Sequence, residues 1–396
     1  MPQSHPSRSR APGGPRVGVT LLLAVVTVVV TLVATPLTGT LLTSAEAARR
    51  LPGATRTAAG GATAATGATE WTTRAVRTTT SVGRKRPAPS PTPSPTPTPT
   101  PSPTPTPGPT RMAFGVSVPG GPTAHAELDE VARLVGEQPG IVLSYVDFTR
   151  PLPVAELDAV RARGAVPVVT WEPWAAGAGV AQPTYSLARI AGGDHDAHIR
   201  AFARDLAAWT TANRQGVRLR FAHEMNGDWY PWAEQVNGNR SGDYVRAWRH
   251  VHTLVEASGA DVEWVWSPNV PYPGSAPVAG LYPGSAYVDV VALDGYNWGT
   301  SQSWSSWQQP QELLGPGLAE LRAVAPGTPV LVAETASAEQ GGDKAAWAAE
   351  LVRYLDAQPD VVGLVWFSHD KEADWRIDSS PAVPTALRAA LAARQG

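Results

Sequence analysis

The chain has 396 residues and no cysteine, which excludes disulfides, zinc–thiolate centres, iron–sulfur clusters and cysteine nucleophiles. Residues 1–110 carry 11 basic and 2 acidic side chains, a net charge of +9, which leaves −11 for the remainder of a chain whose total is −2. Phosphate contacts need clustered Lys and Arg, so we expect no nucleic-acid partner.

The N-terminal segment, residues 1–47, has the pattern of an export signal. A polar stretch with three arginines precedes 19 almost wholly apolar residues, 17–35. This run is long for a signal peptide and just long enough to span a bilayer. Residues 45–47 (Ala-Glu-Ala) fit a small-x-small cleavage site. Two interpretations stay open, a cleaved signal peptide or an N-terminal membrane anchor, and both place the rest of the chain outside the cytoplasm.

Residues 48–110 have the composition of a disordered linker. The first part is rich in Ala and Thr, and 12 of residues 87–109 are prolines that alternate mostly with Ser or Thr. Proline lacks the amide donor that helices and sheets need, so this part should extend as polyproline II over roughly 70 Å, at ~3.1 Å per residue. We interpret it as a stalk or tether for a secreted or surface-attached protein.

From residue 111 to 396, short β-branched runs alternate with helical patterns. The predicted strands are residues 113–119, 141–148, 165–172, 217–224, 262–268, 288–296, 329–335 and 361–368. Helical patterns between them include 126–135, 154–163, 198–211, 244–257, 313–324 and 345–357. Eight strands separated by helices or long loops in about 280 residues predict an α/β fold, a (β/α)8 TIM barrel. A doubly wound sheet is the alternative, but the first strand lacks the Gly-rich phosphate turn that it would need.

Carboxylates and tryptophans gather at the predicted strand ends, where barrel enzymes build their sites. Fourteen of the 15 Trp residues follow residue 110, whereas ordinary cores prefer Leu, Ile, Val and Phe. Trp faces stack on sugar rings and carboxylates do acid, base and nucleophilic work, so this pairing predicts glycoside hydrolysis with a polysaccharide substrate. The candidate site residues are Trp171, Glu172, Trp174, His223, Glu224, Trp229, Tyr296, Trp298, Glu334 and Trp366.

Glu224 and Glu334, at the ends of the fourth and seventh strands, are the candidate catalytic pair. Strand alternation places Arg220, Ala222 and Glu224 on one inward face. Retaining hydrolysis needs carboxyls ~5–5.5 Å apart, and a cation such as Arg220 would lower the pKa of the nucleophile. The alternative is that either Glu is a structural ion pair. Glu172 is a rival catalytic carboxylate that we rank as substrate-contacting, and His223 fits no HExxH zinc motif because position 227 is Gly.

The run from Arg220 to Trp232, RFAHEMNGDWYPW, resembles the acid/base segment of glycoside hydrolase family 26, the β-mannanase family. Residues 282–284, 288–289 and 294–297 are similar to its sixth-strand segment, and residues 332–335 to its nucleophile segment. The resemblance covers roughly residues 112–380. It implies that Glu224 is the general acid/base and Glu334 the nucleophile. It also implies that His223, Trp229, Tyr296 and Trp366 line the subsite where the bond is cleaved, with Tyr296 bonded to the nucleophile.

Most members of this family cleave β-1,4-mannan, whereas others act on mixed-linkage β-glucan or β-1,3-xylan, so the sugar stays open. The resemblance implies a retaining endo-β-mannanase. The alternatives are a related glycanase acting on β-glucan, β-xylan or a bacterial exopolysaccharide, and a non-catalytic carbohydrate-binding wall protein. We expect an extracellular monomer that uses no cofactor and no metal.

Overall fold

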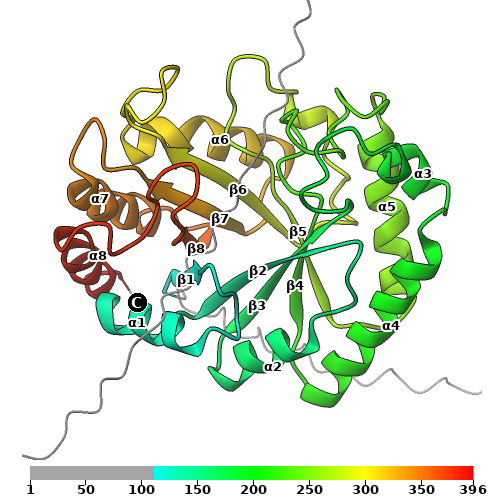
Figure 1. Cartoon of the computed structure of the whole chain (residues 1–396), viewed down its shortest axis with the longest axis horizontal. Coiled ribbons are helices and arrows are strands. Elements are labelled where there is room, and N and C mark those ends of the chain that lie inside the picture. The colour runs from blue at the N-terminus through cyan, green and yellow to red at the C-terminus, as the bar shows by residue number, and fades with distance from the viewer. Residues whose placement is uncertain (1–110, 396) are drawn as a thin grey trace, which may run out of the picture. The chain divides into compact units, whose positions relative to one another are not determined.

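The computed structural model describes residues 111–395. The predicted signal or anchor segment (1–47) and the predicted linker (48–110) lie outside the described residues, so these assignments stay predictions. The described residues form a closed barrel of eight parallel strands in the order β1 to β8, with β8 pairing back to β1 (Figure 1). The predicted (β/α)8 barrel is confirmed.

The strands match the predicted runs, with small differences at their ends. They are β1 (Ala113–Ser117), β2 (Ile141–Asp147), β3 (Val166–Glu172), β4 (Val217–Phe221), β5 (Val262–Trp266), β6 (Val290–Asn297), β7 (Val330–Ser337) and β8 (Val361–Phe367). The largest shortening is at β4, which ends three residues before Glu224.

The helices surround the barrel in Figure 1, where α3 lies beside α5 and α8 lies between α7 and α1. They are α1 (His125–Val135), α2 (Val154–Ala162), α3 (Leu187–Ala191), α4 (Asp196–Asn213), α5 (Asp243–Glu256), α6 (Pro310–Val324), α7 (Lys344–Asp356) and α8 (Ala382–Ala392). Short 3₁₀ turns lie at Pro183–Tyr185 and Val278–Gly280. Among the described residues, every helix is too short or too polar to cross a bilayer.

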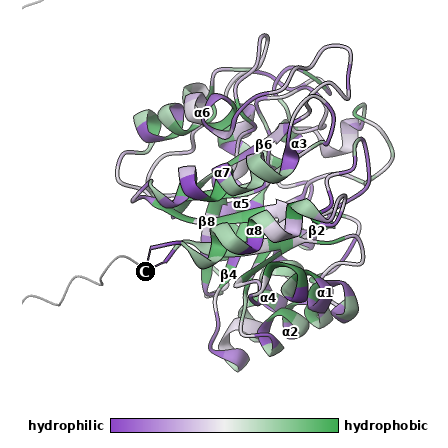
Figure 2. Cartoon of the chain, turned by 90° about the vertical axis from the view of Figure 1, so that its left-hand side faces the viewer, coloured by the Kyte–Doolittle hydropathy of each residue, from purple (hydrophilic) through white to green (hydrophobic). Residues whose placement is uncertain are grey.

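Two apolar layers hold the barrel together, and strand alternation separates them. Small and branched side chains fill the interior, among them Leu143, Val168, Ala292 and Val365. The opposite faces of the strands pack against the helices in a larger cluster. In Figure 2 the central strands are mostly hydrophobic, whereas the helices carry both hydrophobic and hydrophilic stretches. The interior becomes polar toward the carboxyl ends of the strands, where Thr170, Arg220 and Asp294 are fully buried.

Candidate active site

A buried arginine organises the carboxyl end of the barrel. Arg220, on β4, has no exposed surface, and its guanidinium donates hydrogen bonds to three side chains from three other strands. The acceptors are Thr170 Oγ1 at 2.8 Å, Asp294 Oδ2 at 2.8 Å and Glu334 Oε1. Because a buried charge needs partners, the three acceptors fix the guanidinium, and the guanidinium in turn fixes Glu334.

Glu334, on β7, is held as a carboxylate. Besides Arg220, the hydroxyl of Tyr296 on β6 donates to its Oε2 at 2.5 Å. Burial by itself raises the pKa of Glu334, but the Arg220 charge and the hydrogen bond from Tyr296 outweigh burial and bring the pKa to about 2. An ionised, oriented carboxylate is the state that a nucleophile requires.

Glu224 is held in the opposite state. It is 8% exposed, and burial together with the nearby negative charge of Glu334 raises its pKa to about 8. The indole N–H of Trp229 donates to its Oε2 at 2.7 Å, which orients the carboxyl group. A protonated carboxyl beside an ionised one is the division of roles that glycosidases use.

The chain reaches Glu224 through a turn rather than along a strand. Beyond Phe221 the backbone adopts positive φ at Ala222 (46°) and Glu224 (52°), a left-handed conformation that costs non-glycine residues about 1–2 kcal/mol each. The Glu224 amide donates to the Ser267 carbonyl at 2.7 Å, which ties the turn to the end of β5. The predicted shared strand face of residues 220, 222 and 224 is therefore wrong. The predicted carboxyl separation of ~5–5.5 Å stays a prediction.

His223 lies beside Glu334 as a neutral ring. It is 1% exposed, and its Nε2 is 4.0 Å from Glu334 Oε1. Burial, with the Arg220 charge, lowers the pKa of His223 well below its usual range. Its ring packs 4.8 Å from that of Tyr230. Within residues 111–395 its Nδ1 has no hydrogen-bond partner.

Glu172 and Trp174 form a second carboxyl–indole pair at the end of β3. The indole N–H of Trp174 donates to Glu172 Oε2 at 3.2 Å. Burial raises the pKa of Glu172 to about 7, and the hydrogen bond from Trp174 opposes part of that rise. The half-buried Trp174 ring meets Tyr230 and Trp232 edge-on. Glu172 thus faces the same end of the barrel as the candidate catalytic pair but lacks a hydrogen bond to Arg220.

Aromatic rings extend away from both glutamates. On the Glu224 side, Trp229 is 37% exposed and lies 5.7 Å from the ring of Tyr272. On the Glu334 side, Trp298 lies 6.5 Å from Tyr296 and 5.3 Å from Trp304, which is 70% exposed.

Sequence reasoning missed Trp375, which packs against both Tyr296 (5.1 Å) and Trp298 (4.8 Å). It also missed Tyr272. Both lie in loops well beyond the strand ends, so no strand-end signal points to them. Their aromatic character is the only sequence signal that could have included them.

Two predicted sugar-binding residues are instead packing residues. Trp171 has no exposed surface, and its ring stacks on Phe202 of α4 at 4.1 Å. Trp366 also has none. It lies 6.2 Å from Trp347 of α7, and its N–H donates to the Trp375 carbonyl at 2.8 Å. Both side chains point from their strands toward the helices, so the expectation that they contact substrate is wrong.

This chain is similar to a family of known enzymes and to several individual proteins. Residues 157–340 match the model of glycosyl hydrolase family 26. Endoglucanase H of Acetivibrio thermocellus is 38% identical over 273 residues, which are 66% of this chain and 28% of that protein. Mannan endo-1,4-beta-mannosidase A and B of Caldalkalibacillus mannanilyticus is 39% identical over 87 residues, 20% of this chain and 16% of that protein. The chain thus spans less than a third of the length of either relative.

A solved structure of a Cellulomonas fimi endo-beta-1,4-mannanase double mutant shares the fold. Its TM-score is 0.54 with 20% identity, over 72% of this chain and 71% of that one. At this identity the likeness concerns the fold alone. The family model covers all of β4 and β7 and the turn after β4, so it includes both Glu224 and Glu334. The barrel described here belongs to glycosyl hydrolase family 26.

Proposed function

We propose that the protein is an extracellular, retaining endo-β-glycanase that hydrolyses β-1,4-mannan-type polysaccharide by double displacement. The observation that carries this proposal is the opposite pKa shift of two glutamates at one end of the barrel, about 2 for Glu334 and about 8 for Glu224. Between these values one carboxyl is a nucleophile and the other a proton donor. The relatives named as mannan endo-1,4-beta-mannosidases support mannan as the substrate.

In the first step Glu224 gives its proton to the glycosidic oxygen while the Glu334 carboxylate attacks the anomeric carbon. The carbon–oxygen bond to the leaving sugar breaks and a glycosyl ester of Glu334 forms. In the second step Glu224, now a carboxylate, takes a proton from water, and the hydroxide oxygen attacks the anomeric carbon. The ester bond breaks, and Glu334 returns to its hydrogen bonds with Arg220 and Tyr296.

A β-glucan is the second candidate substrate, because the match that extends over 273 residues is to a protein named Endoglucanase H. Purified protein should be assayed on galactomannan, glucomannan, mixed-linkage β-glucan, β-1,4-glucan and β-1,3-xylan. Cleavage of both mannans supports the first substrate, and cleavage of glucans alone supports the second. Binding to these polymers without cleavage of any would leave the non-catalytic wall protein as the remaining alternative.

The retaining mechanism is tested by azide rescue with a dinitrophenyl glycoside, whose leaving group needs no protonation. Glu224→Ala should still form the glycosyl ester but stall at its hydrolysis, and azide should restore turnover and yield the β-glycosyl azide. Glu334→Ala should yield the α-azide, because azide then attacks from the nucleophile's side. The reverse pair of products would mean that the two roles are exchanged. Normal turnover of polymer by both variants would refute the assignment and make Glu172 the next carboxyl to test.

A further inference from the structure

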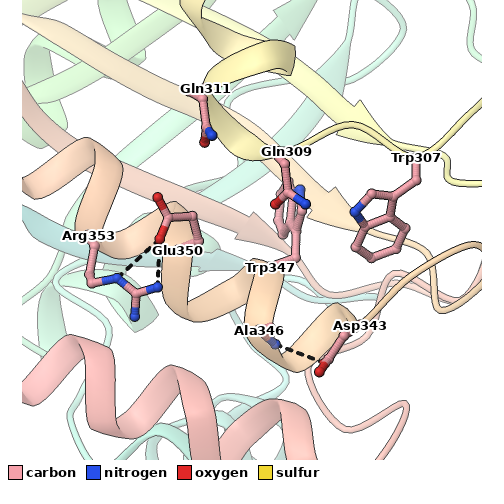
Figure 3. Close-up of a pocket in the computed structure, with 8 residues that line it drawn as sticks. All are labelled: Trp307, Gln309, Gln311, Asp343, Ala346, Trp347, Glu350 and Arg353. Atoms are coloured by element: carbon pink, nitrogen blue, oxygen red, sulfur yellow. Dashed lines mark hydrogen bonds and ion pairs between the residues drawn. The ribbon is translucent and has the colours of Figure 1, made fainter.

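A pocket of about 270 Å³ opens between the start of α6 and the first three turns of α7, and none of the candidate catalytic residues lines it (Figure 3). Trp307 and Gln309 come from the segment before α6, and Gln311 from its first turn. Asp343 directly precedes α7, Trp347 lies in its first turn, and Glu350 and Arg353 lie in its next two turns. The volume lies at the small end of ligand pockets, which span ~300–1,000 Å³, so its occupant is about the size of one or two sugar rings.

The indole of Trp307 rests on backbone. A Cβ at Gly342 would lie 2.3 Å from Cε2 and 2.4 Å from Cδ2 of Trp307, so only glycine lets the chain approach the ring this closely. The segment that carries Trp307 is anchored next to it, because the Trp347 indole donates to the Gln308 carbonyl at 2.9 Å. The Gln308 amide donates to Asn297 Oδ1 at 3.0 Å. The ring is therefore positioned before any ligand arrives.

The polar groups around Trp307 suit an uncharged ligand. Glu350 and Arg353 neutralise each other at 2.6 Å, and Asp343 accepts the Ala346 amide as the helix cap. The Gln309 side chain accepts the Glu312 amide in the capping box of α6, and the exposed amide of Gln311 supplies a donor and an acceptor for hydroxyl groups. The Trp307 ring suits the apolar face of a sugar, and the neighbouring amide suits its hydroxyl edge. Because Glu350 and Arg353 compensate each other, the sugar that fits is a neutral one.

We propose that this pocket is a second binding site for a neutral polysaccharide chain, separate from the catalytic residues, with Trp307 as its platform. The choice of ligand rests on the proposed function. A polymer held at this pocket has an increased effective concentration at the catalytic end of the same molecule, so the pocket acts on long chains and not on short ones.

The test is affinity electrophoresis of the whole chain in gels containing each of the five polysaccharides of the substrate panel, in a Glu334→Gln background that leaves the gel intact. Trp307→Ala should weaken retention at least threefold, and Trp307→Tyr should restore part of it. Gln311→Ala should weaken retention without any risk to the fold, and Gln138→Ala, on the exposed surface after α1, is its matched control. In the active enzyme, Trp307→Ala should raise KM for polymer and leave kcat/KM for a short aryl glycoside unchanged.

Equal retention of Trp307→Ala, Gln311→Ala and the parent would overturn the proposal. So would an equal loss on the short glycoside and the polymer, since that result would place Trp307 in the catalytic subsites. A parent that is retained through Trp307 but hydrolyses no polymer would refute the proposed function and leave this site standing. A parent that hydrolyses polymer but is not retained would refute this binding site and leave the proposed function standing.

Discussion

Tyr296→Phe removes a single hydrogen bond from the candidate nucleophile and leaves the ring in place. The lost O–H···O contact to Glu334 Oε2 is 2.5 Å long. A hydrogen bond to a charged group contributes about 1.5–3 kcal/mol, and one pKa unit corresponds to about 1.4 kcal/mol, so the pKa of Glu334 should rise by about one to two units. The aromatic contact with Trp375 should persist, so the fold should not change.

The assay is the pH dependence of kcat/KM on a soluble substrate. Below its pKa Glu334 is protonated and cannot attack, so the acidic limb of the profile should move up by about one to two units. The basic limb should stay near pH 8, because it reports loss of the Glu224 proton. Tyr354→Phe on α7 controls for the loss of a hydroxyl elsewhere. An unmoved acidic limb with an intact fold would show that Tyr296 does not control the ionisation of Glu334.

Three further outcomes follow from the same geometry. Glu224→Gln should raise Tm at pH 8 but not at pH 4. The pKa of Glu224 is about 8 in the folded protein and near 4.5 in the unfolded chain, so its ionisation destabilises the folded protein as the pH rises from 4.5 to 8, and glutamine removes that destabilisation. Equal Tm gains at both pH values would contradict this. Trp229→Phe should move the basic limb of kcat/KM upward, since the indole N–H favours the ionised form of Glu224, and a downward shift would refute that role. A chain beginning near Pro109 should keep full activity on polymer, because the preceding residues lack the apolar content to pack against the barrel, and a strong loss would reveal a role for them.

The fold was predictable from the sequence because its strands are short β-branched runs with helices between them. Residues 141–147 and 166–172 show the pattern clearly. Helices α3 and α8 were not predicted. α3 has only five residues, too few to show a helical period, and α8 is an Ala- and Leu-rich segment that begins after Pro381.

The predicted site was only partly right because residue type does not say which face of a strand a side chain occupies. Glu172 faces the barrel interior, so Trp171, one residue earlier, must face the helices. Applying the alternation from Glu172 backward would have excluded Trp171 from the substrate site. At β4 the alternation was applied, but it was carried past the end of the strand. The strand ends at Phe221, and two positive-φ residues then redirect the chain to Glu224, which no strand pattern encodes.

One buried cation links the two halves of the proposed chemistry. Arg220 faces two carboxylates, Asp294 and Glu334, so the cluster keeps a net negative charge when both are ionised. The Arg220 charge holds Glu334 in its ionised form, and the resulting negative charge on Glu334 helps to raise the pKa of Glu224. The ionised nucleophile is thus one cause of the protonated acid, and the two states are not set independently. When Glu334 becomes a neutral glycosyl ester, that repulsion disappears and the pKa of Glu224 falls, which favours the ionised form needed as the base of the second step.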